Sequence, residues 1–346
     1  MIGTVTRRVR VAVDAMGGDH APTSEVRGSL QALSALPNDL DLVLIGRKDR
    51  IDEITKDLTL PPNLTIIHAP DVVTMGDEPA TIVKSRKESS LYIGLDMMRQ
   101  GQVDAFVSAG NTGAVMATAT MVCGRLPGVS RPTIGSFFPT QTGQPTLLVD
   151  VGANVDSKPR FLHDYAVMGS IYTEMMLGIS SPRVGLLNVG EEEGKGTAVA
   201  QEAYGMLKTA PINFAGNVEG RDILKGTVDV VVCDGFEGNI VLKFAESILG
   251  FLKSRFRDFA SRSIMNKLLV GMFTPVLRNV LRGMDYQEYG GVPLLGINGV
   301  VIIGHGSSSP QALENMIRRA VEMVQRDVNG KIREVLSPRS PSKVET

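Results

Sequence analysis

The chain has few cysteines and no long apolar run. Only Cys123 and Cys233 occur among its 346 residues, which excludes a disulfide framework and is typical of a protein in a reducing compartment. A reactive thiol needs an activating neighbour, so we expect both cysteines to be small buried residues. No segment approaches the roughly 20 apolar residues of a membrane-spanning helix, and Asp14 interrupts the apolar N-terminal segment too early for a secretory signal. These absences predict a cytoplasmic protein.

Familiar catalytic motifs are missing as well. The segment GEEEGKGT at 190–197 resembles a nucleotide phosphate loop, but it has one residue too few between the glycines. Gly196 also stands where that loop carries the Ser or Thr that binds magnesium. No G-x-G-x-x-G follows a strand-like run and no G-x-S-x-G occurs, so neither a dinucleotide fold nor a serine nucleophile elbow is indicated.

Metal-ligand patterns are absent too. The chain contains four histidines: His20, His68, His163 and His305. They show no metal-ligand spacing with one another or with a cysteine. Clustered Asp and Glu side chains could hold Mg²⁺, but nothing in the sequence demands it, so we expect no metal and no cofactor. In a transferase, the missing protein nucleophile would indicate that the attacking group comes from a substrate.

Size, composition and charge are those of an ordinary globular protein. Hydrophobic residues make up 43% of the chain and charged residues 21%, which is enough for a sizeable buried core. The formal net charge of -1 gives no reason to expect a nucleic-acid partner. We expect flexible ends at 1–8 and 337–346. Between them we expect a single α/β catalytic domain at 9–336, with a helical hairpin inserted at about 248–283.

Strand-like runs alternate with longer segments of helical spacing along the chain. The runs lie at 9–13, 40–45, 64–67, 103–107, 146–151, 183–189, 212–214, 228–233 and 300–303. This alternation predicts βαβ units and a largely parallel sheet in an α/β fold. The last helix is predicted at 310–336, with Ser309 as its N-cap and Pro310 in its first turn.

The first of these runs leads into a polar loop, within VRVAVDAMGGDHAP at 9–22. The loop residues of interest are Asp14, Gly17, Gly18, Asp19 and His20. Paired glycines let a backbone approach a ligand closely, and open α/β sheets bind ligands at the carboxyl ends of their strands. The alternative interpretation is a tight turn with the two aspartates as caps.

Six further strand-like runs end in loops rich in Gly, Asn and Asp. Their candidate site residues are Ser108, Gly110, Asn111, Thr112, Gly113, Asp150, Asn154, Asn188, Lys195, Asn217, Glu219, Asp234, Gly235, Gly238, Asn239 and His305. The turn at 110–113 opens a helix, so it offers free N–H groups and a positive dipole end to a phosphate or carboxylate. We predict that these loops converge on one polar cleft.

A basic amphipathic stretch lies at 251–283, with seven Lys or Arg residues and a single acidic residue, Asp258. We predict two helices, the second opened by Pro275, with an apolar connection at 268–273 between them. Basic residues beside apolar faces suit an anionic membrane surface or an acidic protein; the alternative is burial in a dimer partner. The candidate contact residues are Lys253, Arg255, Arg262, Lys267, Leu268, Leu269 and Phe273.

A shorter basic cluster, KSRK, lies at 84–87 and also has two interpretations. It is either a second surface for an acidic partner or a solvated helix face.

With these residues in view, the chain resembles the phosphate acyltransferases of bacterial phospholipid synthesis. The matching stretches follow the family's order from residue 9 to about 336: VAVDAMGGDHAP, SAGNTGA, LLVDVGANVD, SPRVGLLNVGEEEGKG, GNVEGRDIL, VVVCDGFEGNIVLK and YGGVPLLGINGVVIIGHGSS. The departures are a slightly long N-terminus and Glu237, which stands where a small polar residue is expected.

The resemblance implies an enzyme that converts acyl–acyl-carrier protein and inorganic phosphate to acyl phosphate and free carrier. Phosphate would attack the thioester directly, and the acyl phosphate would supply a membrane glycerol-3-phosphate acyltransferase. The resemblance also implies a three-layer α/β/α fold, like that of isocitrate dehydrogenase and phosphotransacetylase. It further implies a homodimer, peripheral membrane association and no cofactor.

The resemblance and the loop chemistry together suggest roles. The predicted phosphate ligands are Gly110, Asn111, Thr112 and Gly113. Lys195 is proposed as a charge partner, and either His20 or His305 would protonate the departing thiolate. Together with Asn111, these three residues form the predicted catalytic set.

The remaining polar loop residues have less specific predicted roles. Four asparagines are expected to line the cleft: Asn154, Asn188, Asn217 and Asn239. Four aspartates would either orient the reacting groups or serve only the structure: Asp14, Asp19, Asp150 and Asp234.

Two other functions remain open. One is a phosphate acetyl- or butyryltransferase that uses acyl-coenzyme A; the other is a non-catalytic scaffold on a lipid surface whose cleft only binds phosphate.

Overall fold

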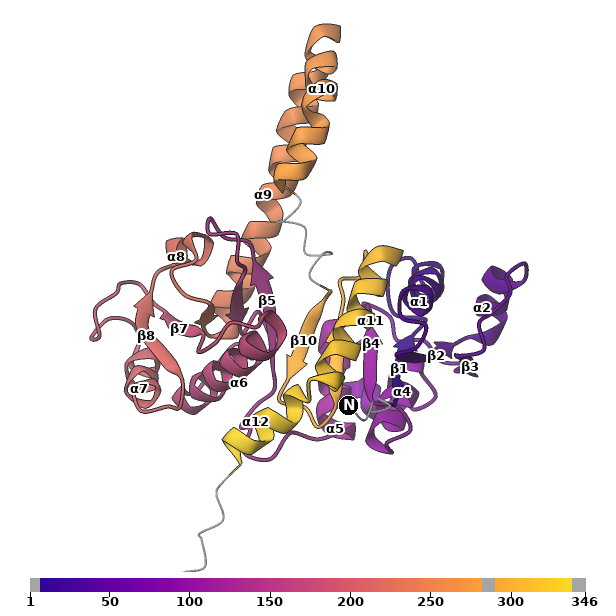
Figure 1. The fold of residues 1–346 in the computed structure, drawn as a ribbon, viewed down its shortest axis with the longest axis horizontal. Helices are drawn as coiled ribbons and strands as arrows, with labels where there is room; N and C mark the ends of the chain where they lie inside the picture. Colours follow the sequence, from indigo (N-terminus) through magenta and orange to yellow (C-terminus); the bar gives the residue numbers. More distant parts are fainter. Residues whose placement is uncertain (1–6, 282–289, 338–346) are drawn as a thin grey trace, which may run out of the picture.

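The computed structural model describes residues 7–281 and 290–337, and within them eleven strands form one continuous sheet. The strands are β1 (Val9–Asp14), β2 (Leu40–Gly46), β3 (Leu64–His68), β4 (Ala105–Ser108), β5 (Thr133–Phe138), β6 (Thr146–Val149), β7 (Arg183–Leu187), β8 (Asn213–Val218), β9 (Val230–Val232), β10 (Val292–Leu295) and β11 (Val300–Ile303). Their order across the sheet is β3-β2-β1-β4-β11-β10-β5-β6-β9-β7-β8 (Figure 1). Every predicted strand is present, whereas β5 and β10 were not predicted.

Strand direction reverses in the middle of the sheet. β10 is antiparallel to both β11 and β5, and β5 is antiparallel to β6. Strands β1 to β4 and β11 therefore run one way, and β6 to β9 run the opposite way, although pairing within each group is parallel. The carboxyl ends of the two groups consequently lie at opposite edges of the sheet. Loops of both groups nevertheless reach one cavity, whereas the loops after β7 and β8, at one end of the strand order, do not line it. The prediction that all the polar loops converge on one cleft is therefore wrong.

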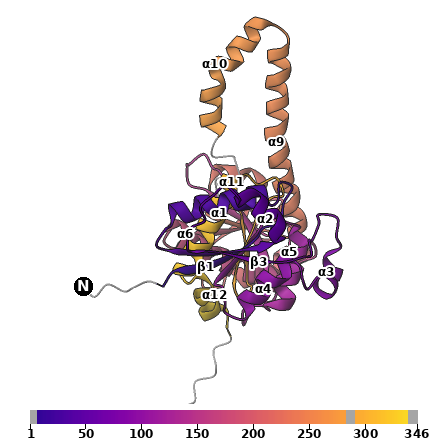
Figure 2. The same cartoon turned by 90° about the vertical axis from the view of Figure 1, so that its right-hand side faces the viewer.

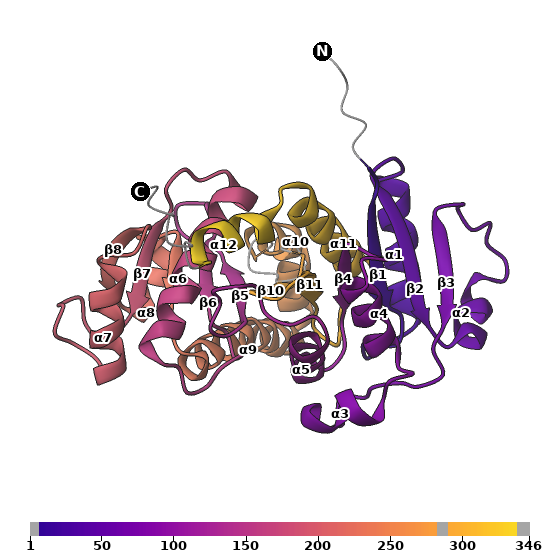
Figure 3. The same ribbon diagram turned by 90° about the horizontal axis from the view of Figure 1, so that it is seen from below.

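Helices cover both faces of the sheet. They are α1 (Thr23–Ala35), α2 (Lys48–Thr55), α3 (Pro79–Ser85), α4 (Ser90–Arg99), α5 (Thr112–Val122), α6 (Pro159–Leu177), α7 (Ala198–Leu207), α8 (Gly220–Lys225), α9 (Gly235–Ser261), α10 (Ile264–Leu281), α11 (Pro310–Gln325) and α12 (Val328–Leu336). Figure 3 shows α11 and α12 on one side of the sheet and α5 and α9 on the other. The three-layer α/β/α architecture is thus confirmed.

Each face of the sheet has its own apolar core because strand residues alternate between the faces. In β1, Val11 and Val13 belong to the core beneath α1, α6 and α11, while Ala12 belongs to the core beneath α4 and α5. In β4, Val107 joins the first core and the fully buried Phe106 the second. Burial on both faces explains why these strands read as continuous apolar runs.

The continuous sheet supports our proposal that residues 9–336 form one domain. The predicted flexible ends lie almost entirely outside the described residues, which begin at Arg7 and end at Ser337.

The predicted single helix at 310–336 is wrong, because α11 and α12 are separate helices. Asp327 between them adopts a left-handed backbone conformation with φ of 50°. Its carboxylate accepts a hydrogen bond from the Gly330 N–H at 3.2 Å and so caps α12. The predicted cap of the first helix is confirmed, since the Ser309 hydroxyl accepts the Ala312 N–H.

The predicted hairpin is present as α9 and α10, which pack together and project away from the body (Figures 1 and 2). Its turn lies at 262–263, so the predictions of a connection at 268–273 and of a second helix opened by Pro275 are wrong. Both segments lie inside α10, because the Ser263 hydroxyl accepts the Asn266 N–H and starts the helix earlier. Among the described residues, no helix is long and apolar enough to span a membrane.

Candidate functional site

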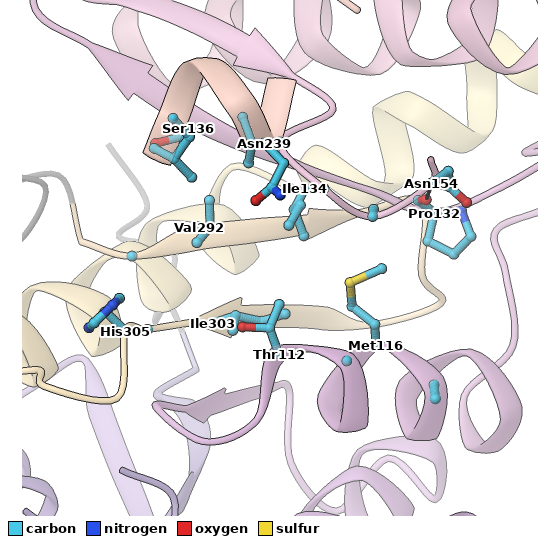
Figure 4. A pocket seen from close by; sticks show the side chains of 18 of the residues that line it. Thr112, Met116, Pro132, Ile134, Ser136, Asn154, Asn239, Val292, Ile303 and His305 are labelled. Carbon is cyan, nitrogen blue, oxygen red and sulfur yellow. Dashed lines mark hydrogen bonds between the residues drawn. The ribbon is translucent and has the colours of Figure 1, made fainter. Parts of the chain in front are cut away.

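A cavity of about 860 Å³ opens on one face of the sheet between α5 and α9 (Figure 4). Its floor is formed by β5, β10 and β11, the strands at which direction alternates. This volume is typical of sites for small molecules. Of the predicted site residues, five line the cavity: Thr112, Gly113, Asn154, Asn239 and His305.

One end of the cavity combines a helix N-terminus with ionisable side chains. Thr112 and Gly113 form the first turn of α5, and His305 follows directly after β11. Lys84 reaches this lining from α3, and Lys243 and Glu246 line the cavity from α9. The start of α5 can bind an anion because its helix dipole favours negative charge; among the lining side chains, Lys84 and Lys243 add positive charge and Glu246 opposes it.

His305 has a defined ring orientation. Its Nδ1 accepts the Ser307 N–H at 3.2 Å and lies 2.8 Å from the Ser307 hydroxyl. In the neutral ring the proton therefore resides on Nε2, which can act as a donor. His20 is exposed on the neighbouring loop and does not line the cavity. That loop is tied to the His305 loop, since the Asp19 N–H donates to the Gly306 carbonyl at 2.7 Å.

Asn111 holds two parts of the chain together. Its Oδ1 accepts the Ala114 N–H at 3.0 Å and caps α5. Its Nδ2 donates to the carbonyls of Met75 and Asp77, each at 3.2 Å. These contacts fasten the segment before α3, which carries Lys84, to the start of α5. The contacts favour a positioning role for Asn111 over the catalytic role that we predicted from the sequence.

Asp14 lies at the centre of a buried network below this end of the cavity. Its carboxylate accepts the hydroxyls of Ser90 at 2.6 Å and Ser108 at 2.8 Å. Burial raises the pKa of Asp14, although these hydrogen bonds lower it. Gly17 and Gly110 pack directly on this network, and a side-chain Cβ at Gly17 would come within 2.9 Å of the Gly110 nitrogen. The glycines thus allow the ends of β1 and β4 to approach closely.

A second buried acid, Glu25, lies beneath the first loop. Its side chain is 1% exposed, and among the described residues its Oε2 has no hydrogen-bond partner. Its Oε1 packs against Gly18, where a Cβ would lie 2.7 Å away. Burial, assisted by the charge of Asp14, raises the pKa of Glu25 to about 8. The group is therefore protonated at neutral pH.

Asp150 organises the opposite end of the cavity. Its carboxylate accepts the N–H groups of Gly152 at 3.0 Å and Ala153 at 2.6 Å. It also accepts both the backbone N–H and the Nδ2 of Asn154, each at 2.9 Å. Burial raises the pKa of Asp150 to about 6. The loop that results holds Asn154 at the cavity wall, next to Pro132 (Figure 4).

The start of α9 is fastened to this loop. Asp234 caps the helix by accepting the Phe236 N–H at 2.8 Å, and it also accepts the Ser157 N–H at 2.8 Å. The Gly235 N–H donates to the Asn154 carbonyl at 2.9 Å. At Gly238 a side chain would overlap the Asp150 carbonyl. These glycines bring α9 close enough for Asn239 to line the cavity.

Four predicted residues lie away from the cavity, at the ends of β7 and β8. The Asn188 Nδ2 donates to the Lys195 carbonyl at 3.1 Å, and the Asn217 Nδ2 donates to the Glu192 carbonyl at 2.8 Å. Glu219 caps α8. Asn217 lies inside β8 and not in a loop, contrary to the sequence prediction. This cluster shapes the 190–197 loop and contributes nothing to the cavity lining.

The sequence analysis missed several lining residues. Lys243 and Glu246 lie four and seven residues after Asn239 on α9, a spacing that puts all three on one helix face. This periodicity was a usable signal. Met116 carries the same signal, since it lies four residues after Thr112 on α5, whereas Arg131, which also lines the cavity, lies on no helix with a predicted site residue.

The two cysteines are unsuited to nucleophilic attack. Burial raises the pKa of Cys123 to about 12 and that of Cys233 well above its usual value. Each thiol donates to a backbone carbonyl, of Leu95 and of Asp150 respectively. In residues 7–281 and 290–337, no group of three or more His, Cys, Asp or Glu side chains is arranged to hold a metal ion.

The fold is that of the phosphotransacetylases. A phosphotransacetylase from Streptococcus pyogenes has a TM-score of 0.62 at 17% identity, covering 92% of this chain and 95% of its own. The EutD phosphotransacetylase from Staphylococcus aureus has a TM-score of 0.59 at 18% identity, covering 92% of this chain and 94% of its own.

Sequence comparison identifies the family. The profile described as "Fatty acid synthesis protein" matches residues 9–331. A phosphate acyltransferase of Heliobacterium modesticaldum is 46% identical over 97% of this chain and 99% of its own length. One from Brevibacillus brevis is 45% identical over 95% of this chain and 97% of its own. The chain belongs to the phosphate acyltransferase family, and it is an acyl-transferring enzyme.

Replacing Asn111 by Asp separates its two functions. The Asp carboxylate still accepts the Ala114 N–H and caps α5, but it cannot donate to the Met75 and Asp77 carbonyls. We expect faster amide hydrogen exchange across residues 71–89, and turnover reduced by about tenfold or more because Lys84 is displaced. Asn111→Ala should additionally lose the cap, at about 1 kcal/mol of stability. Wild-type exchange in the Asp variant would show that Asn111 does not hold the segment.

Replacing Glu25 by Gln should change how stability depends on pH. The folded carboxyl, with a pKa of about 8, holds its proton more tightly than the unfolded one at 4.5. The contribution of Glu25 to wild-type stability is therefore full below pH 4.5, and it falls by up to about 1.4 kcal/mol per pH unit as pH rises to 8. Gln mimics the protonated acid, so the variant should gain relative stability with pH. Denaturant unfolding at pH 5 and pH 8 measures the free energy of unfolding of both proteins. An equal difference between variant and wild type at the two pH values would refute the prediction.

Proposed function

We propose that the chain transfers the acyl group of an acyl–acyl-carrier-protein thioester to inorganic phosphate. The products are acyl phosphate and free carrier, and the acyl phosphate serves phospholipid synthesis. The observation that carries this proposal is one cavity whose lining combines the N-terminus of α5, Lys84 and His305 with an apolar floor.

Phosphate is proposed to bind at the first turn of α5. The backbone N–H groups of Thr112 and Gly113 precede the first intrahelical hydrogen bonds of α5 and lie at the positive end of its dipole. Lys84 and Lys243 line the same cavity from two other helices and add positive charge. These groups would also stabilise the oxyanion that develops on the thioester carbonyl.

The reaction is proposed to be a direct attack by phosphate. A phosphate oxygen forms a bond to the thioester carbonyl carbon, the carbon–sulfur bond breaks, and the thiolate leaves. The Nε2 proton of His305 neutralises the departing sulfur. The raised pKa values of both cysteines support this route, since neither is available as a thiolate.

The α9–α10 hairpin is the proposed contact with the membrane or the carrier. Its basic side chains Lys253, Arg255, Arg262 and Lys267 are all exposed. Leu268, Leu269 and Phe273 on α10 are 64%, 40% and 54% exposed. Because α9 also forms a wall of the cavity, a membrane surface bound to the hairpin would lie near the site that releases acyl phosphate. The consuming enzyme would be a membrane glycerol-3-phosphate acyltransferase.

A homodimer is proposed as the working assembly. Phe236, Ile240 and Phe244 form an apolar stripe on α9, spaced four residues apart, and each is more than half exposed. A stripe of this kind on a water-soluble surface favours burial against another chain. We propose a second copy as that chain.

The likeness to phosphotransacetylases favours one alternative, an acyl-coenzyme A substrate. The test measures thiol release from palmitoyl–acyl-carrier protein and palmitoyl-coenzyme A, with and without phosphate. We expect phosphate-dependent release and acyl phosphate formation with the carrier. Release only from coenzyme A would favour the alternative, and no release from either would leave a binding protein.

Replacing His305 by Gln should lower kcat by about 100-fold, because the leaving thiolate loses its acid. His20→Gln is the matched control, since His20 is exposed outside the cavity lining. Its kcat should stay near that of the wild type. The opposite pattern would assign the acid to His20.

Replacing both Leu269 and Phe273 by Glu should release the enzyme from anionic phosphatidylglycerol vesicles in a cosedimentation assay. The control variant carries Leu58→Glu and Leu224→Glu, which add the same charge at exposed apolar residues elsewhere. The control should bind as the wild type does. Retained binding by the hairpin variant would contradict the membrane proposal, and sedimentation velocity would then test the hairpin as a dimer contact.

A further inference from the structure

The cavity has an apolar middle that the proposed phosphate chemistry at its His305 end does not use. Met116 and Ala117 line it from α5, and Leu242 lines it from α9. The opposite face of α5, with Val115 and Ala119, is buried in the core, so α5 presents one side to the core and the other to the cavity.

The floor of this middle section is a continuous apolar surface. Val292 of β10 and Ile303 of β11 are cross-strand partners, so their side chains lie together on the same face. Leu294 and Ile134 are partners across β10 and β5 and extend this surface. A hydrocarbon chain is the ligand that such a floor accommodates, because Val292, Ile303 and Ile134 supply apolar contacts and Ser136 is the polar side chain that β5 adds to the lining.

The cavity is elongated along α5. Thr112 and Met121 both line it, and nine helical steps of 1.5 Å separate them by about 14 Å. In Figure 4, His305 lies at one end, and Pro132 and Asn154 lie at the other. If the thioester carbonyl reacts at the start of α5, the acyl chain must extend toward the Asn154 end.

We propose that this groove binds the acyl chain and that Met116 determines how long a chain it accepts, an inference that rests on the proposed function. Met116 lies midway along the α5 wall, and its side chain reaches from α5 into the cavity in Figure 4. Methionine is unbranched and flexible, so it can move aside for a long chain. A rigid larger side chain at this position cannot.

The test compares kcat/KM for octanoyl and palmitoyl thioesters of the carrier, with phosphate, in the full-length enzyme. Met116→Trp should lower the palmitoyl-to-octanoyl ratio by at least about tenfold, because the groove is blocked beyond the first carbons. Met116→Ala should keep or raise the ratio. Met206→Trp is the matched control, since Met206 is a half-buried methionine on α7 outside the cavity lining. Its ratio should equal that of the wild type.

A second measurement tests the groove if the Met116→Trp variant has lost all activity. A palmitoyl thioester with a diazirine at its terminal carbon is photolysed on the wild-type enzyme, and labelled peptides are mapped. Label on the lining segments of the groove (α5, β5, β10, β11, α9 or residues 151–154) supports it, and label confined to other segments overturns it. If the Met116→Trp variant is active and its palmitoyl-to-octanoyl ratio is unchanged, the groove proposal is overturned and the proposed function is not. A wild-type enzyme that forms no acyl phosphate from either thioester overturns the proposed function as well.

Discussion

The reversal of strand direction at β10 and β5 is the constraint on which the site depends. Because β10 and β5 are antiparallel to their neighbours, the strand group of β1 to β4 and β11 runs opposite to the group of β6 to β9. The helices α5 and α9 follow strands from opposite groups and run over the same face of the sheet. They leave the middle strands uncovered between them, and the cavity occupies this interval.

Two buried aspartates shape the loops at opposite ends of that cavity. Asp14 gathers the hydroxyls of Ser90 and Ser108, and Asp150 gathers three consecutive N–H groups and the Asn154 amide. Both have raised pKa values because burial outweighs these hydrogen bonds. Many of the polar loop residues therefore bind one another, and a smaller number face the cavity.

Because some polar loop residues bind one another and others face the cavity, the sequence predicted only part of the site. The polar loops of β4, β6, β9 and β11 were recognised from their Gly, Asn and Asp content, and each contributes to the cavity or its support. Composition alone could not separate Thr112, which lines the cavity, from Asn111, whose side chain is occupied in holding α3 and α5 together. Lys195 and Asn217 share the same loop chemistry but follow strands at the far end of the sheet.

Features that depend on neighbouring residues can be read from the sequence. Alternating Val and Ile residues specify the strands, and caps such as Ser309 start helices, because these preferences act over a few residues. Which loops meet depends on the folded arrangement of the strands. That outcome rests on pairing between segments distant in the chain, such as Leu294 with Ile134, whose hydrogen bonds form only after the chain has folded back on itself. No local pattern encodes the direction of such a pair, so the position of the cavity emerges only with the sheet.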